Sequence, residues 1–406
     1  MRHSADRILT SHAGSLPRPD ELIELNSARM AGQSVDEQEF QARLRDAVTD
    51  VARRQRDIGI DIPNDGEYGH TMTGRVNYAA WWTYVFERLG GLEIADIPVW
   101  EMPAHRSEPG KVVLSSFGDR RDQNLFADAY GDPETGVMVS MGQLPTHFPV
   151  CRSPLTYIGQ DALQRDIANA KAAGAAAGVD EVFLNSVGPG SCARFHNDYY
   201  GSDEELLWAA ADAMREEYQA IVEAGLILQI DDPCIAENWD QIVPEPSVAD
   251  YQKFTMIRVE ALNHAISGLP EDRVRFHLCW GSWHGPHVTD IPMRDIVDVM
   301  LSINAGAYLF EAGNVRHEHE WKVWRDVQLP DGKIIMPGVV SHATNLIEHP
   351  ELVADRLVRF AEGVGRENVI AATDCGLGGR VHPQIAWAKL EALAQGAELA
   401  SRRLWC

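Results

Sequence analysis

A short motif in the second half of the chain carries two side chains that can bind a metal ion. His277 and Cys279 lie near the end of a β-type run that begins at Arg273. Because successive side chains of a strand point to opposite faces, residues two apart share a face. An imidazole and a thiolate side by side are two of the four donors that zinc takes in proteins. Alone, the pair is weak support for a metal site, since such a short motif also occurs by chance.

Two further residues of metal-binding type lie at the ends of later β-type runs. Glu311 ends one apolar run, and Cys375 follows another. Taken singly, Cys375 could equally be a buried filler and Glu311 a partner in an ion pair. Together with His277 and Cys279 they make a set of one histidine, two cysteines and a carboxylate, which suits zinc. The four residues therefore predict a zinc site.

The elements that must position these residues follow an alternating pattern. Short apolar runs are separated by longer segments of helical spacing, which predicts an α/β fold with a parallel sheet and helices outside. The eight strand candidates are residues 8–11, 57–62, 181–185, 226–230, 273–279, 306–311, 334–340 and 369–374. Eight βα units predict one TIM (β/α)8 barrel over residues 1–406, with chemistry at the carboxyl ends of the strands. An open doubly wound sheet is the alternative, but no Gly-x-Gly-x-x-Gly follows the first strand.

Helical spacing and start signals place the helices between these runs. Ser202 and Glu205 form a capping box that opens a helix to about residue 224. Further helices are predicted at about 36–55, 161–177, 248–266, 293–303 and 383–400. Residues 89–155 break the pattern with prolines, glycines and isolated charges. We interpret them as a long elaborated loop after the second strand, within the single domain.

The composition excludes several classes of function. A net charge of −24 and a pI of about 5.0 disfavour broad binding to nucleic acid or to anionic membranes. No apolar run is long enough to span a bilayer, and no apolar signal core follows the N-terminus. The six cysteines lack the spacing of a disulfide scaffold. These features predict a cytoplasmic protein with small-molecule partners, and a homo-oligomer is compatible with them.

Seven motifs at the predicted strand ends resemble the catalytic barrel of the cobalamin-independent methionine synthase family. In order they are Ala13-Gly-Ser-Leu-Pro, Asp65-Gly-Glu, Gln229-Ile-Asp-Asp-Pro, His277-Leu-Cys, Phe310-Glu311, Pro337-Gly-Val followed by His342, and Thr373-Asp-Cys-Gly-Leu. The resemblance runs the length of the chain and implies the short, single-barrel form. It also implies a zinc-dependent S-methyltransferase of methionine biosynthesis, which moves a methyl group from a 5-methyltetrahydrofolate-type donor to homocysteine. In that family the residues at His277, Cys279, Glu311 and Cys375 bind the zinc.

The resemblance also implies roles for residues around the metal. Ser15 would bind the carboxylate of the amino-acid substrate, and Glu67 and Asp231 its ammonium group. Two carboxylates facing one cation form charge-assisted hydrogen bonds, so the chemistry agrees. Asp231 could instead cap the helix that follows its strand. His342 would give a proton to the leaving group, a role that suits a pKa near neutrality, although it could also be a loop histidine with its hydrogen bonds satisfied.

The resemblance is weaker on the side of the methyl donor. Phe195 stands where the family has a tryptophan that stacks on folate, and a phenylalanine can also stack. The 89–155 segment has no counterpart. One alternative is therefore zinc-dependent alkyl transfer to another thiol, as in epoxyalkane:coenzyme M transferases, although coenzyme M lacks the ammonium that Glu67 and Asp231 would bind. Another alternative is a non-catalytic protein that binds zinc and a thiol. A metal-free decarboxylase has no use for the four ligands.

Overall fold

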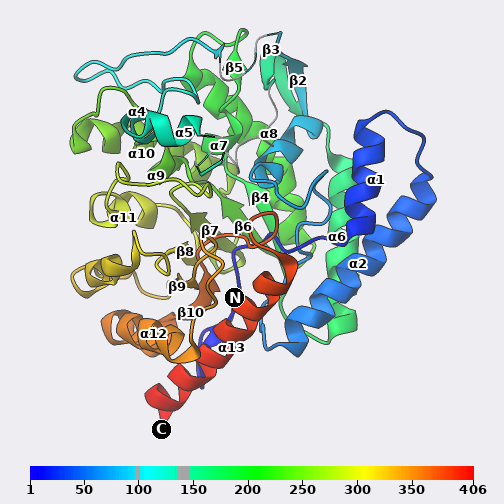
Figure 1. Cartoon of the computed structure of the whole chain (residues 1–406), viewed down its shortest axis with the longest axis vertical. Coiled ribbons are helices and arrows are strands. Elements are labelled where there is room, and N and C mark those ends of the chain that lie inside the picture. Colours follow the sequence, from blue (N-terminus) through cyan, green and yellow to red (C-terminus); the bar gives the residue numbers. More distant parts are fainter. Residues whose placement is uncertain (97, 99–100, 133, 136, 138–146) are drawn as a thin grey trace.

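A curled sheet of seven parallel strands forms the centre of the protein. In a computed structural model, which describes residues 1–406 apart from 97, 99–100, 133, 136 and 138–146, the strand order is β1-β10-β9-β8-β7-β6-β4. Helices surround the sheet on its outer side (Figure 1). The strands are β1 (Leu9–Thr10), β4 (Phe183–Val187), β6 (Ile227–Asp231), β7 (Val274–Leu278), β8 (Ala307–Glu311), β9 (Ile334–Val340) and β10 (Ile370–Thr373).

Each of the six predicted helices is present, and the helices Asp20–Met30 and Pro350–Val364 are additional to them. The predicted cap at Ser202 is confirmed, because its side chain accepts a hydrogen bond from the Glu205 backbone N–H. The reciprocal bond of a capping box differs, since Glu205 Oε2 accepts from the Gly201 N–H instead of the Ser202 N–H. Asp36 caps α2 in the same way, through the N–H groups of Gln38 and Glu39. The helices are α1 (Asp20–Met30), α2 (Glu37–Asp57), α3 (Ala80–Thr83), α4 (Arg121–Leu125), α5 (Ala127–Gly131), α6 (Gln160–Ala177), α7 (Pro189–Cys192), α8 (Asp203–Glu223), α9 (Cys234–Glu237), α10 (Val248–Ala265), α11 (Met293–Leu301), α12 (Pro350–Val364) and α13 (Pro383–Trp405).

The strand predicted at residues 57–62 is wrong. Helix α2 runs to Asp57, and Gly59 follows it with a left-handed φ of 96°, the usual way to end a helix. The next residues still fill the space between β1 and β4: the N–H of Ile62 donates to Thr10 O, and the N–H of Phe183 donates to Pro63 O. Proline has no N–H to continue a ladder, so a regular strand does not form here. Closure into a full eight-stranded barrel stays a prediction.

The side chains of the sheet divide into two apolar layers. An inner cluster inside the curled sheet includes Ile62, Phe183, Leu309 and Met336. A larger outer cluster joins the other faces of the strands to the helices, and Phe276 belongs to it. Because side chains alternate along β7, the neighbours of Phe276 point inward, toward the inner cluster. This alternation directs polar residues of β6 and β7 into the middle of the sheet.

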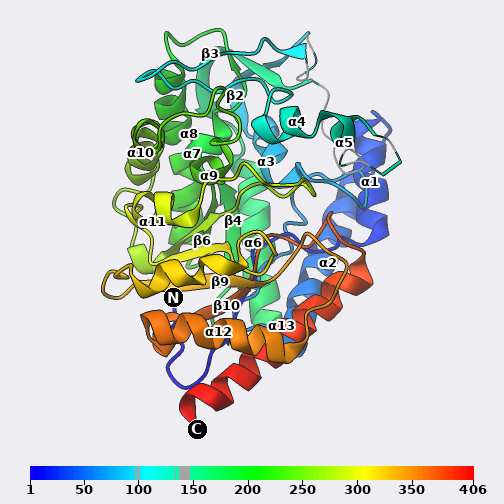
Figure 2. The ribbon, with the colours of Figure 1, turned by 60° about the vertical axis from the view of Figure 1, so that its left-hand side comes forward.

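The segment predicted as an elaborated loop contains regular elements. Strands β2 (Leu89–Ile94) and β3 (Pro149–Tyr157) pair antiparallel, and β5 (His196–Asn197) adds to β3, giving a separate three-stranded sheet. This small sheet lies at the top of Figure 1, and Figure 2 shows it at the same end of the molecule. Part of the predicted 89–155 loop lies outside the described residues. Its place within a single domain stays a prediction.

The described part of this segment is attached to the loop that follows α9. The backbone N–H of Ser115 donates to Gln241 O, and that of Arg121 donates to Asp240 O. Phe117 and Phe148 pack edge to face, and both rings also contact Trp82. These contacts hold the segment over the carboxyl ends of the strands. None of the helices in the described part of the chain is long and apolar enough to cross a membrane.

Candidate functional site

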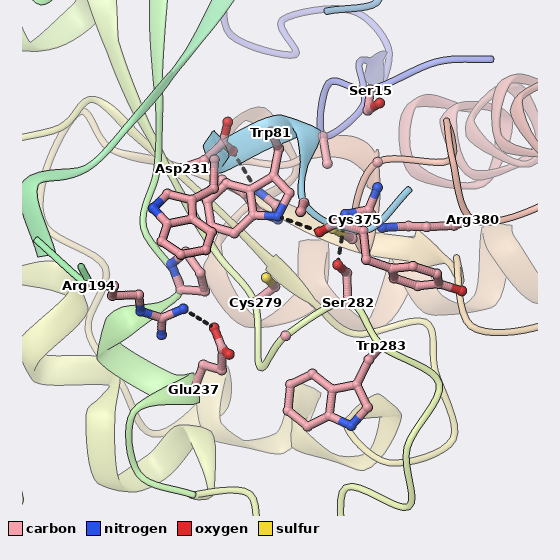
Figure 3. Close-up of a pocket in the computed structure, with 18 of the residues that line it drawn as sticks. Ser15, Trp81, Arg194, Asp231, Glu237, Cys279, Ser282, Trp283, Cys375 and Arg380 are labelled. Carbon is pink, nitrogen blue, oxygen red and sulfur yellow. Dashed lines mark hydrogen bonds and ion pairs between the residues drawn. The ribbon is translucent and has the colours of Figure 1, made fainter. Parts of the chain in front are cut away.

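A pocket of about 1010 Å³, partly open to solvent, lies at the carboxyl ends of the central strands. Its floor holds acidic residues, a histidine and cysteines from several strands, and its outer wall is largely aromatic. In Figure 3, Cys279 and Cys375 lie near the centre, with Arg194 and Glu237 on one side and Arg380 on the other. The residues used below that line it are Ser15, Glu67, Tyr78, Trp81, Trp82, Phe117, Arg120, Tyr130, Phe148, Arg194, Asp231, Glu237, His277, Cys279, Trp283, Cys375 and Arg380.

Three of the four predicted metal ligands meet at this floor. The donor atoms of His277, Cys279 and Cys375 all lie within 4.8 Å of one another, and each residue is at most 6% exposed. A hydrogen bond from Cys279, together with the positive charges of Arg380 and His277, outweighs burial and lowers the pKa of Cys375 to about 5. The same contact raises the pKa of Cys279. One imidazole nitrogen and two sulfurs, one of them a thiolate, form a donor set that fits zinc.

The fourth predicted ligand, Glu311, lies in a neighbouring group. Its Oε1 accepts from the backbone N–H of Trp280 at 2.8 Å, and its Oε2 accepts from Asn314 Nδ2 at 2.6 Å. A carboxylate oxygen of Glu311 that could bind a metal lies within 4.8 Å of the corresponding ligand atoms of His342 and Asp374. Burial, and then the charge of Asp374, raise the pKa of Glu311 to about 8. Its assignment as a zinc ligand stays a prediction.

Asp231 is hydrogen-bonded to His277, the histidine of the metal-ligand group His277, Cys279 and Cys375. Its Oδ1 accepts from His277 Nδ1 at 2.7 Å. Burial lowers the pKa of His277, but the hydrogen bond and charge of Asp231 outweigh it, and the pKa is raised overall. The Asp231 carboxylate does not cap the following helix. The neighbouring Asp232 carboxylate instead accepts from the N–H groups of Gly190 and Cys234.

Glu67 brings an unpaired buried carboxylate to the same floor. It is 3% exposed, and among the described residues its Oε2 has no hydrogen-bond partner. Burial, and then the charge of Asp231, raise its pKa well above the ordinary value. Its φ of 60° is a left-handed conformation that a non-glycine residue rarely adopts, and such strain collects at functional sites. The positive charges of Arg18 and Arg380 oppose this rise in pKa without cancelling it, so a cation bound at Oε2 would favour the ionised carboxylate.

Comparison with known proteins finds relatives that are similar over the whole chain. A methionine synthase of Thermococcus kodakarensis is 24% identical over 97% of this chain and 94% of that protein. One of Saccharolobus solfataricus is 24% identical over 97% and 95%. The B12-independent methionine synthase of Shewanella sp. W3-18-1, solved with selenomethionine, has the same fold, with a TM-score of 0.68 at 22% identity, covering 98% of this chain and 99% of that one. No protein-family model matches.

The chain resembles the cobalamin-independent methionine synthases over its whole length. Of the other residues that the family resemblance picks out, Ser15 lines the pocket, where its hydroxyl donates to Gly378 O at 3.4 Å. Two predicted residues are not among those that line it. His342 is buried behind it, and its Nδ1 has no hydrogen-bond partner within the described structure. Burial, followed by the charge of Arg380, lowers the pKa of His342 well below its ordinary value. Phe195 is buried in the outer apolar cluster.

The aromatic faces of the pocket come from residues other than Phe195. They are Tyr78, Trp81, Trp82, Phe117, Tyr130, Phe148 and Trp283. Beside them, Glu237 accepts from Arg120 at 2.5 Å and from Arg194 at 2.8 Å. Sequence reasoning missed these residues because they lie in loops and in helices of four or five residues, which are too short to show a periodicity. A partial signal was the position of Arg194, directly before the predicted Phe195.

Proposed function

We propose that the protein transfers a methyl group to the thiol of homocysteine, giving methionine, with zinc held by His277, Cys279 and Cys375. The observation that carries this proposal is the meeting of those three donors in a pocket that also holds the unpaired carboxylate of Glu67. Full-length similarity to proteins named methionine synthase supports the reaction. Glu311 is the proposed fourth ligand, and a zinc ion held there would supply a position for the substrate thiol.

The residues of the chain would bind and orient the amino acid. Zinc, when bound, supplies the Lewis acidity that favours the thiolate of the substrate at neutral pH. Glu67 and Asp231 accept hydrogen bonds from the substrate ammonium, which supplies the partner that Glu67 Oε2 lacks. The Ser15 hydroxyl donates to the substrate carboxylate. Trp81 and Trp283 exclude water from the thiolate, since both line the pocket with large apolar faces.

The proposed methyl donor is of the 5-methyltetrahydrofolate type. Its ring would stack on the aromatic wall of the pocket rather than on Phe195. His342 is the proposed proton donor to the departing nitrogen. Because its pKa is lowered, it would have to take up a proton when the donor binds.

Zinc quantitation followed by a donor screen tests the proposal. We expect about one zinc per chain and methionine formed from homocysteine with methyltetrahydrofolate, with methylcobalamin and small methylated compounds as further arms. Cys375→Ser should lose zinc and activity together. A metal-free protein that is active, and whose Cys375→Ser variant keeps full activity, would overturn the proposal.

Calorimetry with two thiols tests the choice of substrate. Homocysteine has the ammonium group that Glu67 would bind, and coenzyme M has a sulfonate and no ammonium. We expect tighter binding of homocysteine. Tighter binding of coenzyme M would contradict homocysteine as the substrate and would favour a thiol without an ammonium group. Binding of zinc and homocysteine without turnover of any donor would indicate the non-catalytic alternative.

A further inference from the structure

Arg380 is a buried arginine of the pocket that has no acidic partner close to it. It lines the pocket and is 8% exposed. Among the described residues, no carboxylate oxygen lies within 4.0 Å of its guanidinium nitrogens. The other two arginines that line the pocket differ, since Arg120 and Arg194 both pair with Glu237. Buried charges in proteins are normally paired, so Arg380 indicates a place for an anion that the described chain does not supply.

The hydrogen bonds of Arg380 leave some of its donors unused. Its Nη1 donates to Gly378 O at 3.0 Å, and its Nη2 donates to Ser282 Oγ at 2.7 Å. Both acceptors are uncharged, and Nε has no hydrogen-bond partner within the described structure. A guanidinium group has five N–H donors, so these two bonds leave most of them unused. The two bonds therefore fix the orientation of the group without neutralising its charge.

The backbone places Arg380 beside Ser15. The N–H groups of Leu377 and Gly378 both donate to Ser15 O, at 2.9 and 2.8 Å. The Ser15 hydroxyl donates to Gly378 O, the same oxygen that accepts from Arg380. A Cβ at Gly376 would lie 2.8 Å from Ser15 Cβ, so only glycine lets the two segments approach this closely. A hydroxyl donor and a guanidinium group thus meet at one carbonyl oxygen of the pocket.

The pocket carries opposite charges on two sides. Glu67 and Asp231 bring carboxylates to it, and Arg380 brings a guanidinium group. In Figure 3, Asp231 lies on one side of the cysteines and Arg380 on the other. At neutral pH an amino acid carries an ammonium group and a carboxylate. Such a substrate has a partner for each of its charges here, whereas a thiol with only an ammonium group would leave Arg380 unpaired.

We propose that Arg380 binds the carboxylate of the amino-acid substrate together with Ser15, and that it makes the pocket select a thiol with an acid group. The inference rests on the proposed function, because it takes the thiol to be an amino acid. Hydrogen bonds from a guanidinium group to a carboxylate are charge-assisted and stronger than those from a neutral hydroxyl. The planar fork of the group also orients the carboxylate. Glu67 and Asp231 keep the ammonium group, so the substrate is held at both of its charged ends.

Two thiols that differ only in the carboxylate measure the contribution of Arg380. They are homocysteine and 3-amino-1-propanethiol, which is homocysteine without its carboxylate. Calorimetry on zinc-loaded Arg380→Met should show homocysteine bound about 30-fold or more weakly than by the wild type, the usual effect of removing one partner of a buried charge pair. The affinity for 3-amino-1-propanethiol should not fall. Arg380→Lys keeps the charge, so it should restore part of the affinity for homocysteine.

A matched variant changes the support of Arg380 and leaves its charge in place. Ser282→Ala removes the acceptor of Nη2, so the guanidinium group is less well oriented. The ratio of the two thiol affinities should fall by a smaller factor than in Arg380→Met. Thermal unfolding shows whether each variant folds, and Arg380→Lys and Ser282→Ala decide if Arg380→Met does not.

The outcomes separate this inference from the proposed function. A wild-type ratio of the two affinities in the folded variants overturns the inference and leaves the proposed function standing. Loss of zinc, or an equal loss of affinity for both thiols, would assign Arg380 to the metal site and also overturn the inference. Zinc-loaded wild-type protein that binds neither thiol overturns both proposals.

Discussion

The outer wall of the pocket depends on one buried carboxylate. Glu237, in α9, accepts from Arg120, which directly precedes α4, and from Arg194, which follows α7. The side chains of all three residues are at most 8% exposed. Glu237 therefore joins three segments that are far apart in the sequence. Glu237→Gln should destabilise the fold, because it leaves two buried guanidinium groups without their shared counter-charge.

The size of the effect follows from the burial of the ion pairs. Removing one partner of a buried ion pair destabilises a protein by about 3–5 kcal/mol. Asp240 Oδ2 lies 3.9 Å from Arg120 Nη1 and supplies part of the lost negative charge. We therefore expect a loss of about 3 kcal/mol in the free energy of unfolding, the lower end of this range. With an unfolding entropy of about 2.1 cal/mol/K per residue, a chain of 406 residues should lose about 4 °C in Tm.

Scanning calorimetry at one scan rate measures the shift. The matched control is Glu245→Gln: Glu245 pairs with Arg121, next to Arg120, but its side chain is 61% exposed. Exposed pairs contribute about 0.2–1 kcal/mol, so the control should shift Tm by about 1 °C or less. A shift for Glu237→Gln as small as the control's, or a rise in Tm, would refute the reasoning.

The pH dependence of Tm tests the same ion pairs of Glu237. Burial alone would raise the pKa of Glu237, but the charges of Arg194 and Arg120 hold it below the ordinary value. A carboxyl with a lowered folded pKa stabilises the protein above its unfolded pKa of about 4.3, and this stability is lost as the pH falls through the folded pKa. The Tm difference between wild type and Glu237→Gln should therefore be constant near neutrality and shrink below about pH 4.

Three further predictions concern the pocket. In metal-free protein at pH 6.5, iodoacetamide should label Cys375 before any other buried cysteine, since its pKa is about 5; mass spectrometry showing another buried cysteine labelled first would contradict this. Gly14→Ala should lower Tm and raise the KM for homocysteine, because φ is 136° and the new Cβ would meet Glu67 Oε1 at 2.3 Å; an unchanged KM would count against it. Trp283→Leu should raise the KM for the methyl donor, whereas Phe195→Leu should lower Tm only; equal KM effects would return Phe195 to the donor site.

Local patterns in the sequence were enough to predict most of the framework. Seven of the eight predicted strands are present, because each is a short apolar run bounded by a turn or a helix. The exception, residues 57–62, has the apolar pattern of a strand, but Gly59 and Pro63 interrupt its backbone. The sequence also indicated that His277 and Cys279 share a face, since a period of two along a strand is a local property.

The partners of each site residue depended on the tertiary structure. Asp231 meets His277 because β6 and β7 pair in one register. Glu311 is held by Trp280 and Asn314, and Phe195 is buried in the outer apolar cluster. The sequence determined which residues can bind a metal and that they lie at strand ends. Only the fold decided which carboxylate is free, because hydrogen-bond partners far apart in sequence are set by strand register and loop packing, which no local pattern encodes.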